Sequence, residues 1–74
     1  MAYIDFKVIH KWNNDKDASW QATDGKTTIL FTTSKSYDKI GVLYTVECSK
    51  TGYFQEYGIG PVKHRIKQLF SQTN

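Results

Sequence analysis

Residues 58–70 read GIGPVKHRIKQLF, and this pattern predicts a C-terminal amphipathic helix. The single proline of the chain fixes φ at a value suited to the first helical turn. Lys63 and Lys67 fall outside the apolar stripe of this helix and are expected to be solvated, whereas Ile66 and Phe70 should be buried. The apolar side chains that share one stripe at helical spacing are Val62, Ile66, Leu69 and Phe70. The rest of the chain has to supply an apolar surface for this stripe.

The region before the helix alternates apolar and polar residues with the period of a β-strand. Ile4, Phe6 and Val8 predict a first strand with these three side chains facing inward. The same register continues inward through His10 and Trp12. We therefore expect His10 at the edge of the core rather than in a ligand site.

The clearest turn signal is the Asp-Gly pair at residues 24–25. Because alternating apolar residues flank this pair, it predicts a hairpin with a two-residue type I′ turn. Such a turn would place Trp20 opposite Ile29 and Ala22 opposite Thr27, which makes one face of the hairpin apolar.

Two further strands are expected, over residues 42–48 and 53–57. A four-residue turn between them would pair Tyr53 with Cys48 and direct both side chains to the same face.

Polar residues at 13–17 and 34–39 predict connecting segments. For residues 18–21, which follow the first of these segments, one helical turn is the alternative to a second strand. Residues 1–74 should form a single domain of the α+β class. The predicted architecture is a small antiparallel β-meander or open barrel of four to five strands, followed by one C-terminal amphipathic helix. A three-stranded meander with the helix across one face is the alternative.

Composition indicates the compartment. Cys48 is the single cysteine of the chain, and small domains without a disulfide are typical of reducing, intracellular surroundings. The N-terminal segment alternates in polarity and includes Asp5 and Lys7, unlike a signal peptide. The longest apolar runs are about four residues, whereas a membrane helix needs roughly 20. We expect a cytoplasmic protein with no membrane partner.

Charge is distributed unevenly along the chain. Residues 1–56 contain seven lysines and seven acidic residues, which cancel. Lys63, Arg65 and Lys67 therefore carry the whole net charge of +3. A basic helix face of this kind favours a partner with an acidic surface.

Gly58, Ile59, Gly60 and Pro61 resemble the hairpin of helix-hairpin-helix DNA-binding modules. In such modules the hairpin presents backbone N–H groups to a phosphate, helped by the start of the helix that follows. The resemblance implies an anion contact at Gly58 and Gly60. It ends after these four residues, because those modules usually carry a small residue where this chain has His64. A plain helix start with glycine for the turn is the alternative interpretation.

Catalysis is not expected. His10, His64 and Cys48 are the candidate bases and nucleophile, but a place at the edge of the core accounts for His10 and a buried apolar role accounts for Cys48. The sequence also shows no group that would activate Cys48. No HxH, CxxC or HExxH spacing is present, so we expect neither a metal nor another cofactor.

A binding protein remains, with two candidate partners. One is a protein with an acidic surface, which this chain would engage stoichiometrically as an inhibitor or adaptor of the type that phages and mobile elements carry. The other is nucleic acid, with the helix cations on phosphates and tyrosines stacked on bases. Three cations are few for a nucleic-acid binder, and two Trp, five Tyr and four Phe are more aromatics than so small a core needs, so we favour the protein partner. An open strand edge also offers a route to a homodimer. The expected contact residues are Lys63, His64, Arg65, Lys67, Tyr37, Tyr53 and Tyr57.

Overall fold

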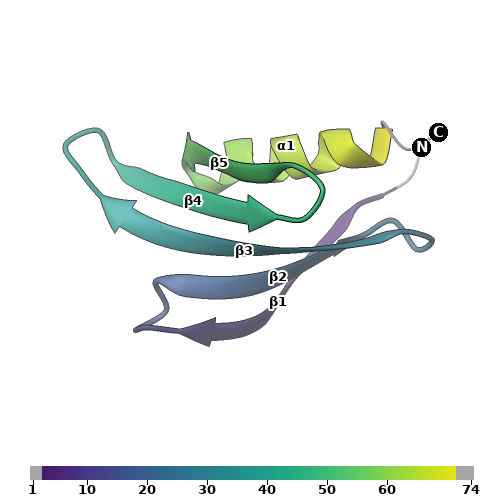
Figure 1. Cartoon of the computed structure of the whole chain (residues 1–74), viewed down its shortest axis with the longest axis horizontal. Coiled ribbons are helices and arrows are strands. Elements are labelled where there is room, and N and C mark those ends of the chain that lie inside the picture. Colours follow the sequence, from purple (N-terminus) through teal and green to yellow (C-terminus); the bar gives the residue numbers. More distant parts are fainter. Residues whose placement is uncertain (1–2, 72–74) are drawn as a thin grey trace.

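The computed structural model describes residues 3–71, and these residues form five strands and one helix. The strands are β1 (Asp5–Trp12), β2 (Asp17–Thr23), β3 (Thr28–Tyr37), β4 (Val42–Cys48) and β5 (Gly52–Tyr57), and the helix is α1 (Ile59–Ser71). Each strand pairs antiparallel with the next in the order β1-β2-β3-β4-β5, and over these residues the sheet does not close into a barrel (Figure 1). The predicted α+β meander with a C-terminal helix is confirmed.

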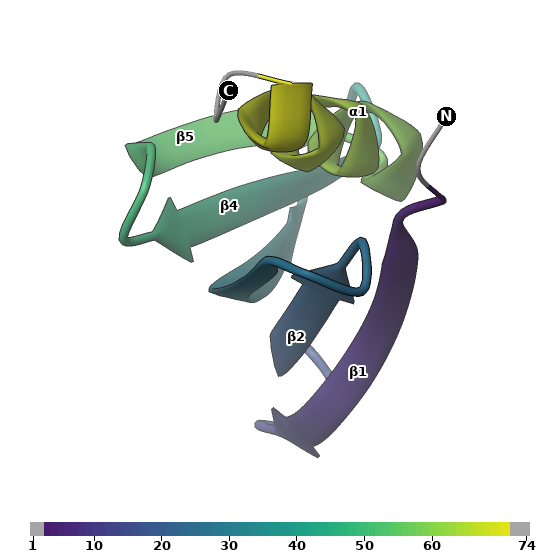
Figure 2. The same cartoon turned by 90° about the vertical axis from the view of Figure 1, so that its right-hand side faces the viewer.

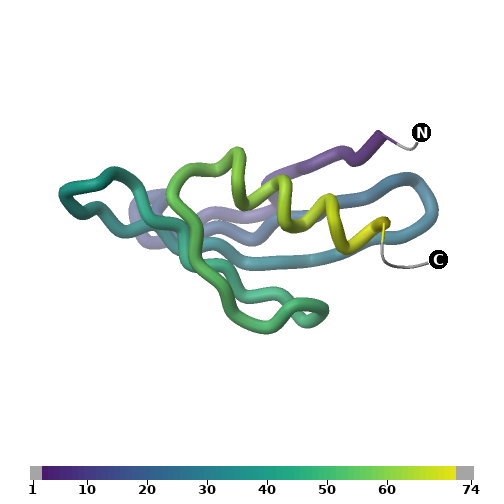
Figure 3. Tube along the Cα trace, turned by 90° about the horizontal axis from the view of Figure 1, so that it is seen from above, coloured from purple at the N-terminus to yellow at the C-terminus, as the bar shows by residue number. Residues whose placement is uncertain are grey.

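The helix covers one face of the sheet, here called the inner face. Val62 and Ile66 are fully buried there, as the apolar stripe predicted. Leu69 and Phe70 pack against the same core but remain half-buried, so Phe70 is less enclosed than expected. The strands curl around one side of the helix (Figure 2), and α1 runs along the same long axis as the strands (Figure 3). The sheet residues of this core are Ala22, Ile29, Phe31, Val46, Cys48 and Phe54.

β1 departs from the predicted register. A β-bulge between Val8 and His10 inserts one extra residue, so that His10 pairs with Ser19 and Trp12 with Asp17. Because one extra residue exchanges the two faces of a strand, His10 and Trp12 lie on the opposite, outer face of the sheet. The prediction that both side chains point inward is wrong. Their rings instead stack on each other, with centroids 5.6 Å apart.

The loop between β2 and β3 is longer than predicted, because residues 24–27 all belong to it. The Asp24 carboxylate holds this loop by accepting hydrogen bonds from two of its backbone amides, at 2.8 and 2.9 Å. Trp20 consequently pairs with Phe31 and not with Ile29. Since the register moves by two residues, the predicted inner face of this hairpin is unchanged.

β3 extends through a segment that was predicted to be a polar link. Pairing with β4 continues as far as Tyr37 and Val42, which leaves residues 38–41 as the turn. Asp38 caps this turn by accepting hydrogen bonds from two backbone amides, at 2.8 and 3.1 Å. Residues 18–21 belong to β2, so the alternative of a helical turn there is also wrong.

The turn between β4 and β5 has three residues instead of four. Cys48 pairs with Gly52, whose φ of +79° suits a glycine. Tyr53 therefore pairs with Glu47 and not with Cys48. A difference of one residue exchanges the faces of β5, so Tyr53 and Tyr57 lie on the outer face.

Candidate functional site

Three lysine side chains from different elements line one cleft on the inner face: Lys11 of β1, Lys35 of β3 and Lys63 of α1. The cleft has a volume of about 260 Å³, and Ile59, the first residue of the helix, also lines it. Two aromatic side chains, Trp20 and Tyr44, form part of its wall, and this combination of cations and rings makes the cleft the candidate site.

Lys63 faces the sheet rather than the solvent. Its Nζ lies 5.4 Å from the centroid of the Phe6 ring and 5.8 Å from that of the Trp20 ring, within the range of a cation–π interaction. The side chain is half-buried, so the prediction that Lys63 is solvated is wrong. The cause is the curl of the sheet, which brings β1 alongside the flank of α1 (Figure 2).

The other two lysines reach the cleft through strand geometry. Lys35 continues the inward register of β3, and its Nζ lies 6.0 Å from the centroid of the Tyr44 ring. Lys11 pairs with Ala18 on the inner face, because the bulge in β1 turns it inward. Asp15 supplies the one carboxylate among the residues that line the cleft. The site therefore carries an excess of positive charge.

The start of α1 adds to this positive potential, because the first-turn amides of a helix have no intrahelical acceptor. Gly60 lies in that first turn. Gly58 has a φ of +89°, and its amide donates a hydrogen bond to the Val42 carbonyl at 3.0 Å. Of the two predicted anion contacts, Gly58 therefore already uses its amide in a hydrogen bond to the sheet. A strand, β5, precedes this turn, and the arrangement differs from the helix-hairpin-helix that the local resemblance implied.

Arg65 is tied to β5. Its Nε forms a salt bridge of 3.0 Å with Glu56 Oε2, and its guanidinium lies 4.7 Å from the centroid of the Phe54 ring. This charge is therefore partly compensated within the chain.

His64 and Lys67 lie on the exposed side of the helix. A ring nitrogen of His64 is 3.3 Å from the side-chain nitrogen of Gln68, one turn further along. The exposure of Lys67 confirms the prediction for that residue. Of the four predicted contact residues of the helix, His64 and Lys67 thus point away from the sheet, whereas Lys63 and Arg65 contact it, and Arg65 remains exposed.

The three predicted contact tyrosines do not share one surface. Tyr53 and Tyr57 lie on the outer face, whereas Tyr37 lies at the end of β3 in the register of the inner face. The Tyr57 hydroxyl donates a hydrogen bond to Asp38 Oδ2 at 2.6 Å. This hydrogen bond, together with turn amides, lowers the pKa of Asp38. It also raises the pKa of Tyr57.

Sequence reasoning missed Lys11, Lys35 and the rings of Trp20 and Tyr44. Carrying the alternation of Phe31 beyond the predicted end of its strand would have found Lys35. Lys11 has no such signal, because neither a glycine nor a proline marks the bulge that turns it inward.

Within residues 3–71, no three His, Cys, Asp or Glu side chains are grouped so that they could hold a metal ion. Over the same part of the chain, no helix has the length and apolar character needed to cross a bilayer. Neither a family model, nor a curated protein, nor a solved structure matches the chain. Function therefore has to be inferred from the cleft and from the two faces of the sheet.

Proposed function

We propose that this protein is a small, non-catalytic binding protein that docks stoichiometrically, as an inhibitor or adaptor, onto the acidic surface of another protein. The observation that supports the proposal is the convergence of Lys11, Lys35 and Lys63 around two aromatic rings. Like charges brought together repel each other, so an anionic group from a partner complements this cleft. The lone Cys48 is buried and unpaired, which suits the reducing cytoplasm where we expect this partner.

Recognition depends on an acidic side chain of the partner that enters the cleft. The lysine ammonium groups donate charge-assisted hydrogen bonds to its carboxylate. Lys35 and Lys63 are half-buried, so salt and water screen them less than cations on an open surface. Lys67 extends the positive surface along the exposed side of the helix, where His64 also lies.

A protein partner fits this geometry better than nucleic acid does. Specific DNA binders contact roughly 6–10 phosphates, whereas a cleft of about 260 Å³ accommodates one or two acidic groups. The salt bridge to Glu56 occupies Arg65, which removes one helix cation from contact with phosphates. Nucleic acid is the second candidate, because Gly60 lies at a helix start and Lys67 is exposed one turn beyond Lys63.

Affinity capture from a lysate of the source organism tests the proposal, with the purified protein as bait. The bait is compared with a Lys11→Glu/Lys35→Glu variant. Its matched control is Lys26→Glu/Lys39→Glu, which makes the same change of charge at two exposed turn positions. We expect the wild-type bait to capture a protein partner, and this capture should survive nuclease treatment. The control variant should capture the same partner, whereas the cleft variant should not.

Two outcomes would count against docking on a protein through this cleft. Capture that disappears after nuclease treatment identifies nucleic acid as the partner, and binding should then weaken log-linearly with salt concentration. Capture that is equal for both variants places the contact surface away from the cleft. Circular dichroism spectra of the variants separate either result from a loss of fold.

A further inference from the structure

The outer face of the sheet has no role in the function proposed above. The helix leaves this face uncovered (Figure 2). A lone exposed apolar residue is ordinary, whereas several on one sheet face are typical of an interaction surface. The exposed large apolar residues of the outer face are Ile9, Trp12, Leu30, Tyr53 and Tyr57.

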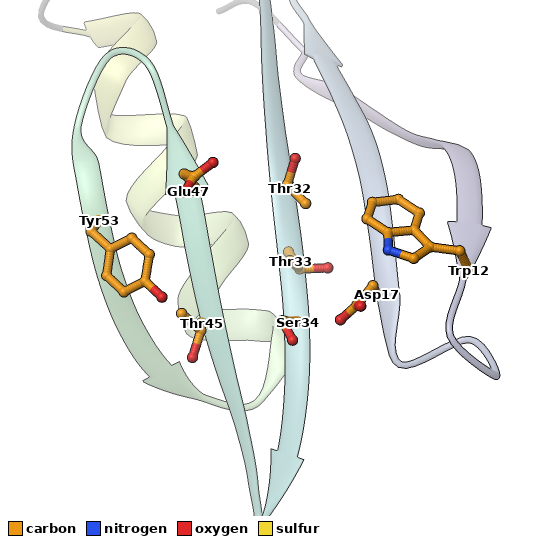
Figure 4. A pocket seen from close by; sticks show the side chains of 8 residues that line it. All are labelled: Trp12, Asp17, Thr32, Thr33, Ser34, Thr45, Glu47 and Tyr53. Atoms are coloured by element: carbon orange, nitrogen blue, oxygen red, sulfur yellow. The ribbon is translucent and has the colours of Figure 1, made fainter.

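A hollow of about 200 Å³ lies on this face. The rings of Trp12 on β1 and Tyr53 on β5 lean over the sheet from its two edge strands (Figure 4). Both rings reach this face through the irregularities described above, the bulge in β1 and the three-residue turn before β5. The hydroxyl-bearing side chains between the two rings are those of Thr32, Ser34 and Thr45.

The charged residues that line the hollow, Asp17 and Glu47, are both acidic. Asp17 Oδ2 accepts a hydrogen bond from the side chain of Asn13 at 3.2 Å. Its Oδ1 is buried and has no hydrogen-bond partner among residues 3–71. A buried carboxylate oxygen without a donor is costly, so the Asp17 carboxylate is incompletely paired within residues 3–71 and gains from a further donor.

We infer that the hollow binds a basic, extended segment of a second partner protein. One lysine or arginine side chain of that segment lies against the Trp12 ring and donates to the Asp17 carboxylate, and a second pairs with Glu47 beside Tyr53. The two carboxylates stand on the strands that flank β3 and are offset by two residues along it, so their backbone positions are about 12 Å apart at the usual strand spacing and rise, and one cation does not reach both. Basic residues at positions i and i+2 of an extended segment, about 7 Å apart at the backbone, reach both through their flexible side chains.

Charge complementarity selects this occupant. A second copy of the chain, placed face to face, would set Asp17 and Glu47 against the same carboxylates. The inner cleft is basic and the outer hollow is acidic, so the chain acts as an adaptor that holds an acidic partner on one face and a basic partner on the other. Each site can be tested without the other.

An NMR titration of the ¹⁵N-labelled protein tests the inference with a defined probe, the capped peptide acetyl-Ala-Arg-Ala-Arg-Ala-amide. The matched ligand replaces both arginines by citrulline, a neutral group of the same shape. With the arginine peptide we expect saturable shifts at the Trp12 indole and at the amides of Thr32 and Thr45. The citrulline peptide should bind about tenfold more weakly, because it lacks both charge-assisted hydrogen bonds.

Variants of the protein locate the binding site. Asp17→Asn and Glu47→Gln should each weaken binding of the arginine peptide about fivefold to tenfold. Asp5→Asn also removes one negative charge, but from the opposite end of β1, and should leave binding unchanged. The inference is overturned by equal binding of the two peptides, by the absence of saturable binding at about 10 mM peptide, or by shifts confined to the inner cleft. A wild-type dimer that buries the outer face, detected by sedimentation equilibrium, would overturn it as well.

Discussion

Lys63 shows how one side chain can serve both the fold and the proposed site. The first turn of a helix ordinarily favours an acidic residue, because the amides there carry partial positive charge. In this chain the curled sheet places the centroids of the Phe6 and Trp20 rings 5.4 and 5.8 Å from the Lys63 ammonium group. These cation–π contacts offset the unfavourable placement of a cation in the first helical turn. The same contact holds the charge at the mouth of the cleft, where an anion can reach it.

Lys63→Gln should lower the free energy of unfolding by about 0.5–1 kcal/mol, because the substitution removes the cation from two ring faces. Lys67→Gln removes the same charge one turn further along at an exposed position, and should change this free energy by less than about 0.5 kcal/mol. Urea unfolding of both variants measures the difference. Equal effects would show that the ring contacts of Lys63 contribute nothing to stability.

The hydrogen bond between Tyr57 and Asp38 makes part of the stability depend on pH. The pKa of Asp38 lies below its ordinary value of 3.8 in the folded chain, so its contribution is present above pH 3.8 and is lost as the pH falls through the folded pKa. The pKa of Tyr57 lies above its ordinary value of 10.0, so its contribution is present below pH 10.0 and is lost as the pH rises through the folded pKa.

Tyr57→Phe should remove the share of this dependence that the tyrosine hydroxyl provides. We expect the difference in unfolding free energy between wild type and variant to be largest near about pH 6 and to be smaller at about pH 2, because protonation of Asp38 in acid removes the charged acceptor of this hydrogen bond. Urea unfolding at both pH values measures it. A difference that stays constant would mean that the hydrogen bond does not stabilise the folded chain.

Among the elements, the helix was the most predictable, and the turns were the least. Burial of Val62 and Ile66 follows from a period of 3.6 residues, which needs only neighbouring residues to be recognised. Turn lengths depend on side-chain hydrogen bonds such as those of Asp24 and on backbone geometry such as that of Gly52. Because a single residue exchanges the faces of a strand, one turn length was enough to move Tyr53 from the predicted face of Cys48 to the outer face.

The turn before β5 and the start of α1 provide a matched pair of glycines. Gly52 has a φ of +79°, so Gly52→Ala should lower the free energy of unfolding by about 1–2 kcal/mol even though no atom crowds the site. At Gly60 the backbone is helical and a methyl group also meets no atom within 4 Å, so Gly60→Ala should raise it by about 0.4–1 kcal/mol. Thermal melts of both variants show whether each substitution stabilises or destabilises the fold. Stabilisation by Gly52→Ala would contradict the turn geometry described here.

At the scale of the whole molecule, the curl of the sheet decides which residues meet. Lys11, Lys35 and Lys63 are far apart in the sequence, and no local pattern could have predicted that they line one cleft. The edges of the sheet are β1 and β5. A bulge and two lysines on β1 disfavour edge-to-edge pairing, so β5 is the edge through which we would expect a homodimer to form.

The most direct test of the proposed cleft is an NMR titration with the capped peptide acetyl-Ala-Glu-Ala-Glu-Ala-amide, followed at the Trp20 indole N–H and at the lysine side chains. The Trp20 indole is a good reporter because it lines the cleft while its hydrogen bond to Thr33, at 2.9 Å, holds it in place. We predict saturable shifts at Trp20 and at the cleft lysines, lost in Lys11→Gln/Lys35→Gln and retained in Lys26→Gln/Lys39→Gln. Shifts confined to His64 and Lys67, or a response that both double variants share equally, would contradict an anion site in the cleft.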